Sequence, residues 1–146
     1  MRAYGRRPDE LRPVKITPNF LTSPPGSCLI EMGGTRVVCS AMIDETVPHW
    51  MKGNGKGWVT AEYSMLPASS PQRVGRERST VGGRTPEIQR LIGRSLRSCT
   101  DHSDLGSRSS LPACNVLAYH VGPRHPAITG AYGPPRLASL QLPPNC

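Results

Sequence analysis

The sequence predicts a domain that mixes strands with helix, and four elements lead to this expectation. Two strand-like runs, 27–32 and 35–43, flank a Gly-Gly pair. Apolar and polar residues alternate over 58–66, which is typical of a third strand, and apolar residues follow the helical period over 85–97. The 146 residues have the length of one domain. A domain of that size can bury a core without disulfides or metals.

Gly33-Gly34 predicts a tight hairpin, because both residues tolerate the positive φ that two-residue hairpin turns use. The two-residue turn fixes the register. Glu31 then faces Arg36, and Cys28 faces Cys39. The facing cysteines are interpreted as small buried thiols rather than as a disulfide.

The third strand is expected over 58–66, and Pro67 ends it. Alternation places Val59, Ala61, Tyr63 and Met65 on one face. The preceding segment, 44–56, is expected to be a loop. Nearer the N-terminus, residues 19–22 could open a further strand.

The clearest helix is expected over 85–97. Thr85 can cap it, Pro86 suits its first turn, and Glu87 complements the helix dipole there. One apolar stripe follows the helical period and should be buried. It consists of Ile88, Leu91, Ile92 and Leu96.

The remaining segments carry weaker patterns. Residues 69–83 have no hydrophobic period and predict a basic loop. After residue 98 only 116–117 and 127–132 look like strand or helix. The proline-rich end, 133–146, is expected to be irregular, so the chain divides into a domain over 1–132 and a tail over 133–146.

The charge is strongly positive, with a net value of +8 and a pI near 9.8. Within residues 69–97 there are seven arginines and two glutamates. Clustered positive charge favours a polyanionic partner such as nucleic acid. The alternative is a generally basic surface with no such partner.

Five scattered cysteines without a Cys-x-x-Cys pair argue against a disulfide framework and a zinc site. This number and spacing of cysteines predicts a reduced, cytoplasmic protein. The first thirteen residues are charged and suggest no signal peptide. No apolar stretch approaches the length of a membrane span, so no membrane partner is expected.

Gly82-Gly83-Arg84 stands directly before the expected helix. Free N–H groups at a helix N-terminus attract anions, glycine lets a phosphate approach the backbone, and a guanidinium can donate two hydrogen bonds to its oxygens. Gly122-Pro123-Arg124 is a second arginine close to a glycine. Taken alone, each segment is as well explained by an ordinary loop or turn.

Four ordered segments of the chain form a recognisable set. They are Arg6-Arg7-Pro8-Asp9-Glu10-Leu11-Arg12-Pro13-Val14, Gly33-Gly34-Thr35-Arg36-Val37-Val38-Cys39, Gly57-Trp58-Val59-Thr60-Ala61-Glu62-Tyr63-Ser64-Met65-Leu66-Pro67, and the stretch from Gly82 to Arg97. Together these segments resemble the ribonuclease PH family. From residue 99 to Tyr132 the similarity is weaker but stays in register.

The resemblance implies an α+β fold of the ribosomal S5 domain 2-like type, here truncated, and a homo-hexamer. It also implies a phosphate-dependent tRNA nucleotidyltransferase, a phosphorolytic 3′-to-5′ exoribonuclease. Such an enzyme trims tRNA precursors and other RNA 3′ ends with inorganic phosphate as co-substrate, and it releases nucleoside diphosphates. Carried over by position, Arg84 and the segment Gly122, Pro123 and Arg124 would bind phosphate. Arg73, Arg76 and Arg78 would bind RNA, and Mg²⁺ is expected for the family.

The sequence departs from the family pattern near its end. Pro123 stands where the family has a threonine, and proline has neither the N–H nor the hydroxyl that would serve phosphate. No Asp or Glu follows Asp104, so no Mg²⁺ ligands or catalytic residues are assigned. Phosphorolysis by this chain alone is expected to be slower by on the order of 10³-fold. The alternatives are a non-catalytic RNA-binding fragment and a frame-shifted, non-functional product.

Overall fold

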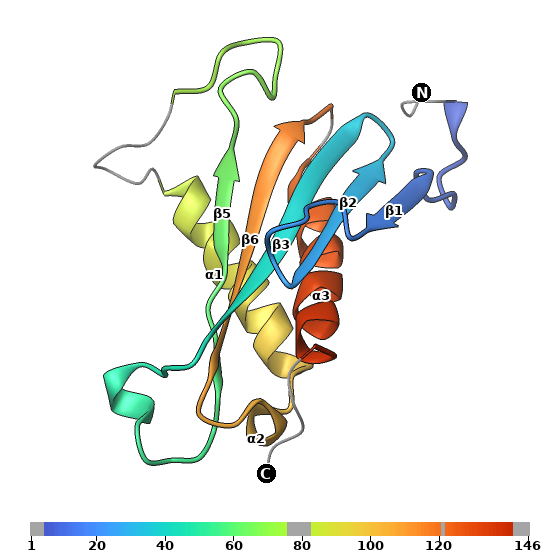
Figure 1. Cartoon of the computed structure of the whole chain (residues 1–146). Helices are drawn as coiled ribbons and strands as arrows, with labels where there is room; N and C mark the ends of the chain where they lie inside the picture. The colour runs from blue at the N-terminus through green and yellow to red at the C-terminus, as the bar shows by residue number, and fades with distance from the viewer. Residues whose placement is uncertain (1–4, 76–82, 121, 142–146) are drawn as a thin grey trace.

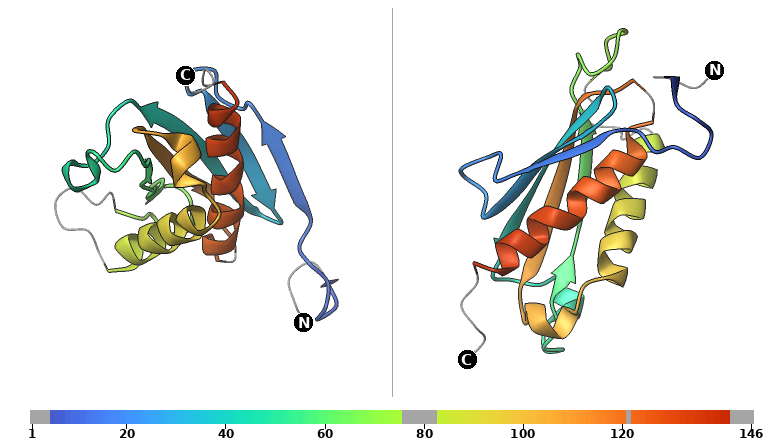
Figure 2. Two further views of the ribbon diagram at one scale, coloured as in Figure 1. Left: turned by 90° about the horizontal axis from the view of Figure 1, so that it is seen from below. Right: turned by 90° about the vertical axis from the view of Figure 1, so that its right-hand side faces the viewer.

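One mixed sheet with two long helices on the same face forms the fold (Figure 1). The computed structural model describes residues 5–75, 83–120 and 122–141. Both views in Figure 2 place helices α1 and α3 side by side on that face. No helix of the described ranges lies on the opposite face.

The sheet has six strands in these ranges, and they pair in the order β1-β2-β3-β6-β4, with β5 also pairing with β6. The strands are β1 Val14–Pro18, β2 Gly26–Met32, β3 Thr35–Asp44, β4 Trp58–Val59, β5 Glu62–Met65 and β6 Ser109–Ala118. Pairs β1-β2, β2-β3 and β3-β6 are antiparallel, whereas β4 and β5 run parallel to β6.

The predicted hairpin register is confirmed. Glu31 pairs with Arg36 and Cys28 with Cys39 across the turn. Gly33 has a φ of 61°, the left-handed conformation that the tight turn requires. Both cysteines are buried and free, so the interpretation as small core thiols is confirmed.

The third predicted strand is divided into β4 and β5 by an interruption at residues 60–61. Its predicted inner face is confirmed, because Val59, Ala61 and Tyr63 are buried and Met65 packs against the core. Backbone hydrogen bonds to β6 continue through the interruption, since Thr60 N–H donates to the Ser110 carbonyl at 3.1 Å. The segment is one edge of the sheet with an irregular centre.

Helix α1 spans Arg84–Ser98, so the expected start near Thr85 is confirmed. The apolar stripe faces the sheet with Ile88, Ile92 and Leu96 buried, and Leu91 is half-buried at its border. The expected cap is wrong. Gly83 occupies the N-cap position without a side-chain hydrogen bond, and Thr85 lies inside the first turn.

Helix α3 spans Arg124–Ser139 and corrects the prediction of an irregular tail for residues 133–139. Pro134 and Pro135 predicted a break, because proline cannot donate to the carbonyl four residues earlier. For Pro134 that carbonyl belongs to Gly130, and the Cys28 thiol donates to it instead at 3.2 Å. Tertiary packing against β2 thus offsets the local preference; residues 142–146 lie outside the described ranges.

Two other expectations are corrected. Strand β6 has ten residues where only 116–117 looked strand-like. The N-terminal strand is β1, not residues 19–22, and Asn19 directly after it has a φ of 54° that ends the extended backbone. The loop after β3 contains a short 3-10 helix, η2 His49–Met51, and helix α2 His102–Leu105 precedes β6.

The core lies between the sheet and the two long helices. It consists mainly of aliphatic residues and thiols, as the low aromatic content requires. Its buried centre contains Ile30, Val37, Cys39, Val59, Ile88, Ile92, Val116, Ala127 and Ala131. Among the described residues, no helix is long and apolar enough to cross a membrane.

Candidate phosphate and RNA site

Arg84 is the first residue of α1 and is exposed. The N-cap residue Gly83 precedes it, and the first helical turn contains Glu87 as its only acidic residue. The positive end of the helix dipole and the Arg84 guanidinium both favour an anion. The expected arrangement of glycine, arginine and helix start is therefore present, although Gly82 lies outside the described ranges.

Arg124 is the first residue of α3, so its position parallels that of Arg84. Gly122 has a φ of 49°, which turns the chain into the helix, and the buried Pro123 occupies the N-cap position. Arg124 Nη2 donates to Glu87 Oε1 at 2.9 Å. This ion pair joins the first turns of the two helices, which lie at the same end of the sheet (Figure 2).

Tyr63 lies on β5 and belongs to the buried core. Its side chain is 3% exposed, and its hydroxyl has no hydrogen-bond partner in the described structure. Burial raises the pKa of the Tyr63 phenol to about 12, while the positive charges of Arg84 and Arg124 oppose that rise. Both guanidinium groups therefore act on the same buried phenol.

Helix α1 is attached to β5 at this point. Gln89 Oε1 accepts a hydrogen bond from the Tyr63 N–H at 3.1 Å. Tyr63 also pairs with Cys114 in the β5-β6 ladder. These contacts attach α1 and β6 to the strand segment that carries the phenol.

A cavity of about 570 Å³ opens beside Tyr63, which is enough volume for a small ligand. Its polar lining consists of the side chains of Tyr63, Ser64, Arg84, Thr85, Gln89, Asn115 and Tyr119. Val74 and Gly75 of the basic segment line its other side. The cavity therefore connects the start of α1 with the segment that carries the arginines of the predicted RNA-binding loop.

The first part of that loop lacks helix and strand, as expected, over residues 69–75. Arg73 is exposed there. The loop base is attached to the domain, because the Ser69 carbonyl accepts the Tyr119 N–H at 2.8 Å and the Pro67 carbonyl accepts the Val74 N–H at 2.9 Å. Arg76 and Arg78 lie outside the described ranges.

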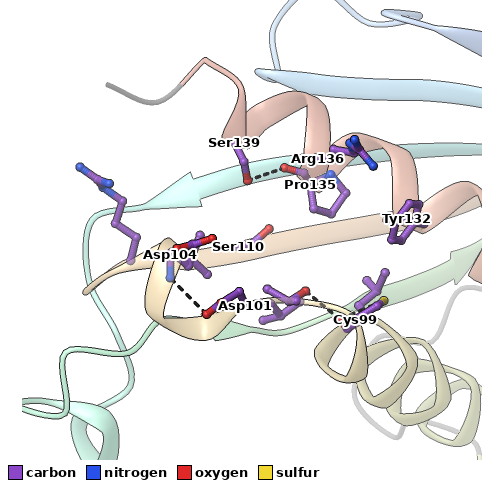
Figure 3. Close-up of a pocket in the computed structure, with 13 residues that line it drawn as sticks. Cys99, Asp101, Asp104, Ser110, Tyr132, Pro135, Arg136 and Ser139 are labelled. Atoms are coloured by element: carbon purple, nitrogen blue, oxygen red, sulfur yellow. Dashed lines mark hydrogen bonds between the residues drawn. The ribbon is translucent and has the colours of Figure 1, made fainter. Parts of the chain in front are cut away.

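A second cavity, of about 380 Å³, lies at the other end of α1 and is drawn in Figure 3. Asp101 and Asp104 of the α2 segment lie on one side, and Pro135, Arg136 and Ser139 of α3 lie on the other (Figure 3). Asp101 is engaged as the cap of α2, since its carboxylate accepts from Ser103 N–H at 2.9 Å. No residue predicted from the sequence to bind phosphate or RNA lines this cavity.

Two further polar residues of this region, Asn115 and His120, have ordinary structural contacts. Asn115 Oδ1 accepts a hydrogen bond from Ser64 Oγ at 2.6 Å, and His120 N–H donates to Thr35 Oγ1 at 3.4 Å. Within the described residues, no group of three or more His, Cys, Asp or Glu side chains could hold a metal ion. The described residues therefore do not fit the Mg²⁺ expected for the family.

Sequence reasoning identified Arg84 and Arg124 but not Tyr63. Tyr63 was assigned only to the buried face of a strand, because alternation shows burial and nothing about the hydroxyl. Gln89 was likewise an unremarked polar residue of the helix. The residue type could have pointed to Tyr63, because a tyrosine at a core position normally needs a hydrogen-bond partner for its hydroxyl.

The amino-acid sequence is similar to those of known ribonucleases PH. Over 133 residues the chain is 54% identical to a ribonuclease PH of Rhodococcus erythropolis, a match that spans 90% of this chain and 51% of the relative. A ribonuclease PH of Mycobacterium sp. strain KMS is 55% identical with the same coverage. The chain thus spans about half the length of these curated relatives.

Solved structures show the same fold at low identity. The Archaeoglobus fulgidus exosome with RNA bound to the active site has a TM-score of 0.76 at 23% identity, covering 89% of this chain and 53% of that one. Rice Rrp46 has a TM-score of 0.72 at 19% identity, covering 88% and 57%. The expected ribonuclease PH-type α+β fold is thereby confirmed.

The family model described as "3' exoribonuclease family, domain 1" matches residues 10–132. This match covers most of the chain and includes the hairpin, β5, the two arginines and the start of α3. The chain therefore belongs to the 3′ exoribonuclease family, the family of ribonuclease PH.

Proposed function

We propose that this chain carries the phosphate-binding and RNA-binding part of a phosphorolytic 3′-to-5′ exoribonuclease. One observation carries the proposal: Arg84 and Arg124 begin two adjacent helices, and the ion pair of Arg124 with Glu87 joins the first turns of these helices. Two guanidinium groups and two helix N-termini at one place favour a doubly charged anion. Membership of the family supports inorganic phosphate as that anion.

The chemistry assigned to these arginines is the binding and orientation of the attacking phosphate. A phosphate oxygen forms a bond to the phosphorus of the terminal RNA phosphodiester. The bond from that phosphorus to the 3′ oxygen of the preceding nucleotide breaks, and this oxygen takes a proton. The products are a nucleoside diphosphate and an RNA shorter by one residue. Positive charge placed beforehand around the phosphate stabilises the charge that develops in the transition state.

The RNA substrate is assigned to the basic loop that begins at Ser69. Arg73 is exposed on it, and the sequence continues with Arg76 and Arg78. Arginines that contact phosphates bind RNA with a strong salt dependence. We propose tRNA precursor 3′ ends as the substrate class, within tRNA and rRNA processing, with the active form a cytoplasmic homo-hexamer. The domain over 1–132 would carry these contacts.

A binding role without catalysis is the second candidate. Pro123 favours it, since it occupies the N-cap position of α3 and has no N–H to offer a phosphate. In this case the chain would hold RNA through the basic loop and bind phosphate weakly.

The test is a single-turnover assay with a tRNA precursor carrying a labelled 3′ extension and excess protein. We expect slow release of nucleoside diphosphate that requires inorganic phosphate and is lost in Arg84→Gln. RNA binding without any phosphate-dependent release would establish the second candidate. Release that proceeds equally without phosphate would contradict the proposal, because hydrolysis gives monophosphates.

A further inference from the structure

We propose that the Tyr63 hydroxyl is a third ligand of the anion site, donating a hydrogen bond to a phosphate oxygen held by Arg84 and Arg124. This inference rests on the proposed function, because it deepens the assignment of the same site. Three observations carry it: the burial of an unpartnered hydroxyl, the charges around it and its rigid placement.

The first observation is the hydroxyl itself. The Tyr63 side chain is 97% buried and its oxygen contacts no donor or acceptor within the described structure. Leaving a buried hydroxyl unpaired costs free energy, and phenylalanine would fill the same space without that cost. A tyrosine at this position is explained when a ligand supplies the missing partner.

The charges around the phenol decide what that partner is. The positive groups that act on it are Arg84 and Arg124, and the other two groups are the Tyr119 phenol and the Cys114 thiol. The Glu87 carboxylate is already engaged by Arg124 at 2.9 Å. Two guanidinium groups supply positive charge and donors only, and the protonated phenol can add a further donor, so the fitting ligand is an anion with several acceptor oxygens.

The placement of the phenol is rigid. Its backbone N–H is bound by Gln89 of α1, and its strand is paired with β6 at Cys114. Arg84 lies one and a half turns before Gln89 on the same helix and lines the same cavity as Tyr63. The hydroxyl is therefore held in place before the ligand arrives, which lowers the entropy cost of binding.

Two sources can provide the phosphate oxygen: free inorganic phosphate and the terminal phosphodiester of RNA. The experiment treats them separately. One arm titrates inorganic phosphate, and the other titrates a short oligoadenylate in phosphate-free buffer. Both arms use the whole chain as wild type, Tyr63→Phe, Arg84→Gln and the matched control Tyr132→Phe, which removes a hydroxyl from an exposed tyrosine of α3.

We expect Tyr63→Phe to weaken phosphate binding by about tenfold, the loss typical of one hydrogen bond to a charged group. Its thermal midpoint without ligand should equal or exceed that of the wild type, because no unpaired hydroxyl remains. Tyr132→Phe should leave the affinity unchanged. Weakening in the oligoadenylate arm alone would also support the proposal and assign the phosphodiester as the ligand.

Three outcomes would overturn the proposal. Equal affinities of wild type and Tyr63→Phe for both ligands, with binding lost in Arg84→Gln, would remove Tyr63 from the site and leave the proposed function intact. A lower ligand-free midpoint with unchanged affinities would assign the hydroxyl a structural role. Absence of binding in the wild type in both arms would overturn this proposal and the proposed function together.

Discussion

Arg124 and Glu87 join the first turns of α3 and α1 through an ion pair of 2.9 Å between Nη2 and Oε1. Both side chains are partly exposed, at 41% and 59%. An exposed pair of this kind stabilises the fold by at most about 1 kcal/mol. Its larger consequence is electrostatic, since the carboxylate offsets part of the positive charge that the proposed anion site needs.

Glu87→Gln should therefore strengthen phosphate binding, by about threefold, because Arg124 then loses its competing carboxylate. The free energy of unfolding should fall by less than about 1 kcal/mol, from the lost ion pair and the lost interaction with the helix dipole. Calorimetric titration with inorganic phosphate measures the first effect. The control is Glu45→Gln, which breaks a comparable exposed pair with Arg108 elsewhere and should leave phosphate affinity unchanged. Weaker binding in Glu87→Gln would show that the carboxylate orients Arg124.

Arg73→Gln should reduce the affinity for single-stranded RNA and its dependence on salt. Each phosphate contact contributes about 0.7 to the slope of log K against log salt for a single strand. The slope should become shallower by about that amount. Filter binding of a labelled RNA at several salt concentrations measures it. Arg136→Gln on α3 is the matched control, and an equal change in that variant would indicate a general charge effect.

Elements with local signals could be predicted from the sequence. The Gly33-Gly34 turn determines the hairpin register through backbone geometry alone, and the spacing of Ile88, Ile92 and Leu96 determines the buried face of α1. In both cases the structure follows from residues that are close together in the sequence. The two arginines before helix starts were recognised for the same reason.

Elements that depend on distant contacts could not be predicted in this way. Pro134 and Pro135 oppose a helix locally, and α3 continues because Cys28 of β2 donates to the Gly130 carbonyl. The unpaired hydroxyl of Tyr63 is likewise a property of the packed domain. Sequence alternation predicts that its ring is buried and cannot show which groups surround the oxygen.

Gly130→Ala should destabilise the fold by about 1–3 kcal/mol, because an added methyl group overfills a packed contact. A Cβ at this position would lie 2.6 Å from Ile30 Cγ2 and 2.8 Å from Cys39 Sγ. Urea unfolding measures the loss. Gly133→Ala in the same helix is the control, since a Cβ there meets nothing within 4 Å and should add up to about 1 kcal/mol of stability. Equal effects of both changes would show that α3 does not pack on β2 and β3 as described.

The pH dependence of stability should reveal the buried thiol of Cys39. The pKa of the Cys39 thiol lies far above its ordinary value of 9.0. The main cause is the hydrogen bond to Cys114, whose sulfur lies 3.6 Å away; a hydrogen bond with Cys28 and burial add to the rise. The folded chain keeps this proton while the unfolded chain loses it above pH 9, so the unfolded state binds fewer protons there. Stability is therefore fully present below about pH 9 and should fall above it by about 1.4 kcal/mol per pH unit for this group.

Tyr63, with its pKa raised to about 12, should add a second fall above pH 10. Urea unfolding at several values between pH 8 and pH 11 measures the slope, and Cys39→Ser should lose the part that begins near pH 9. Parallel curves for wild type and Cys39→Ser would show that the thiol ionises as readily in the folded chain as in the unfolded one.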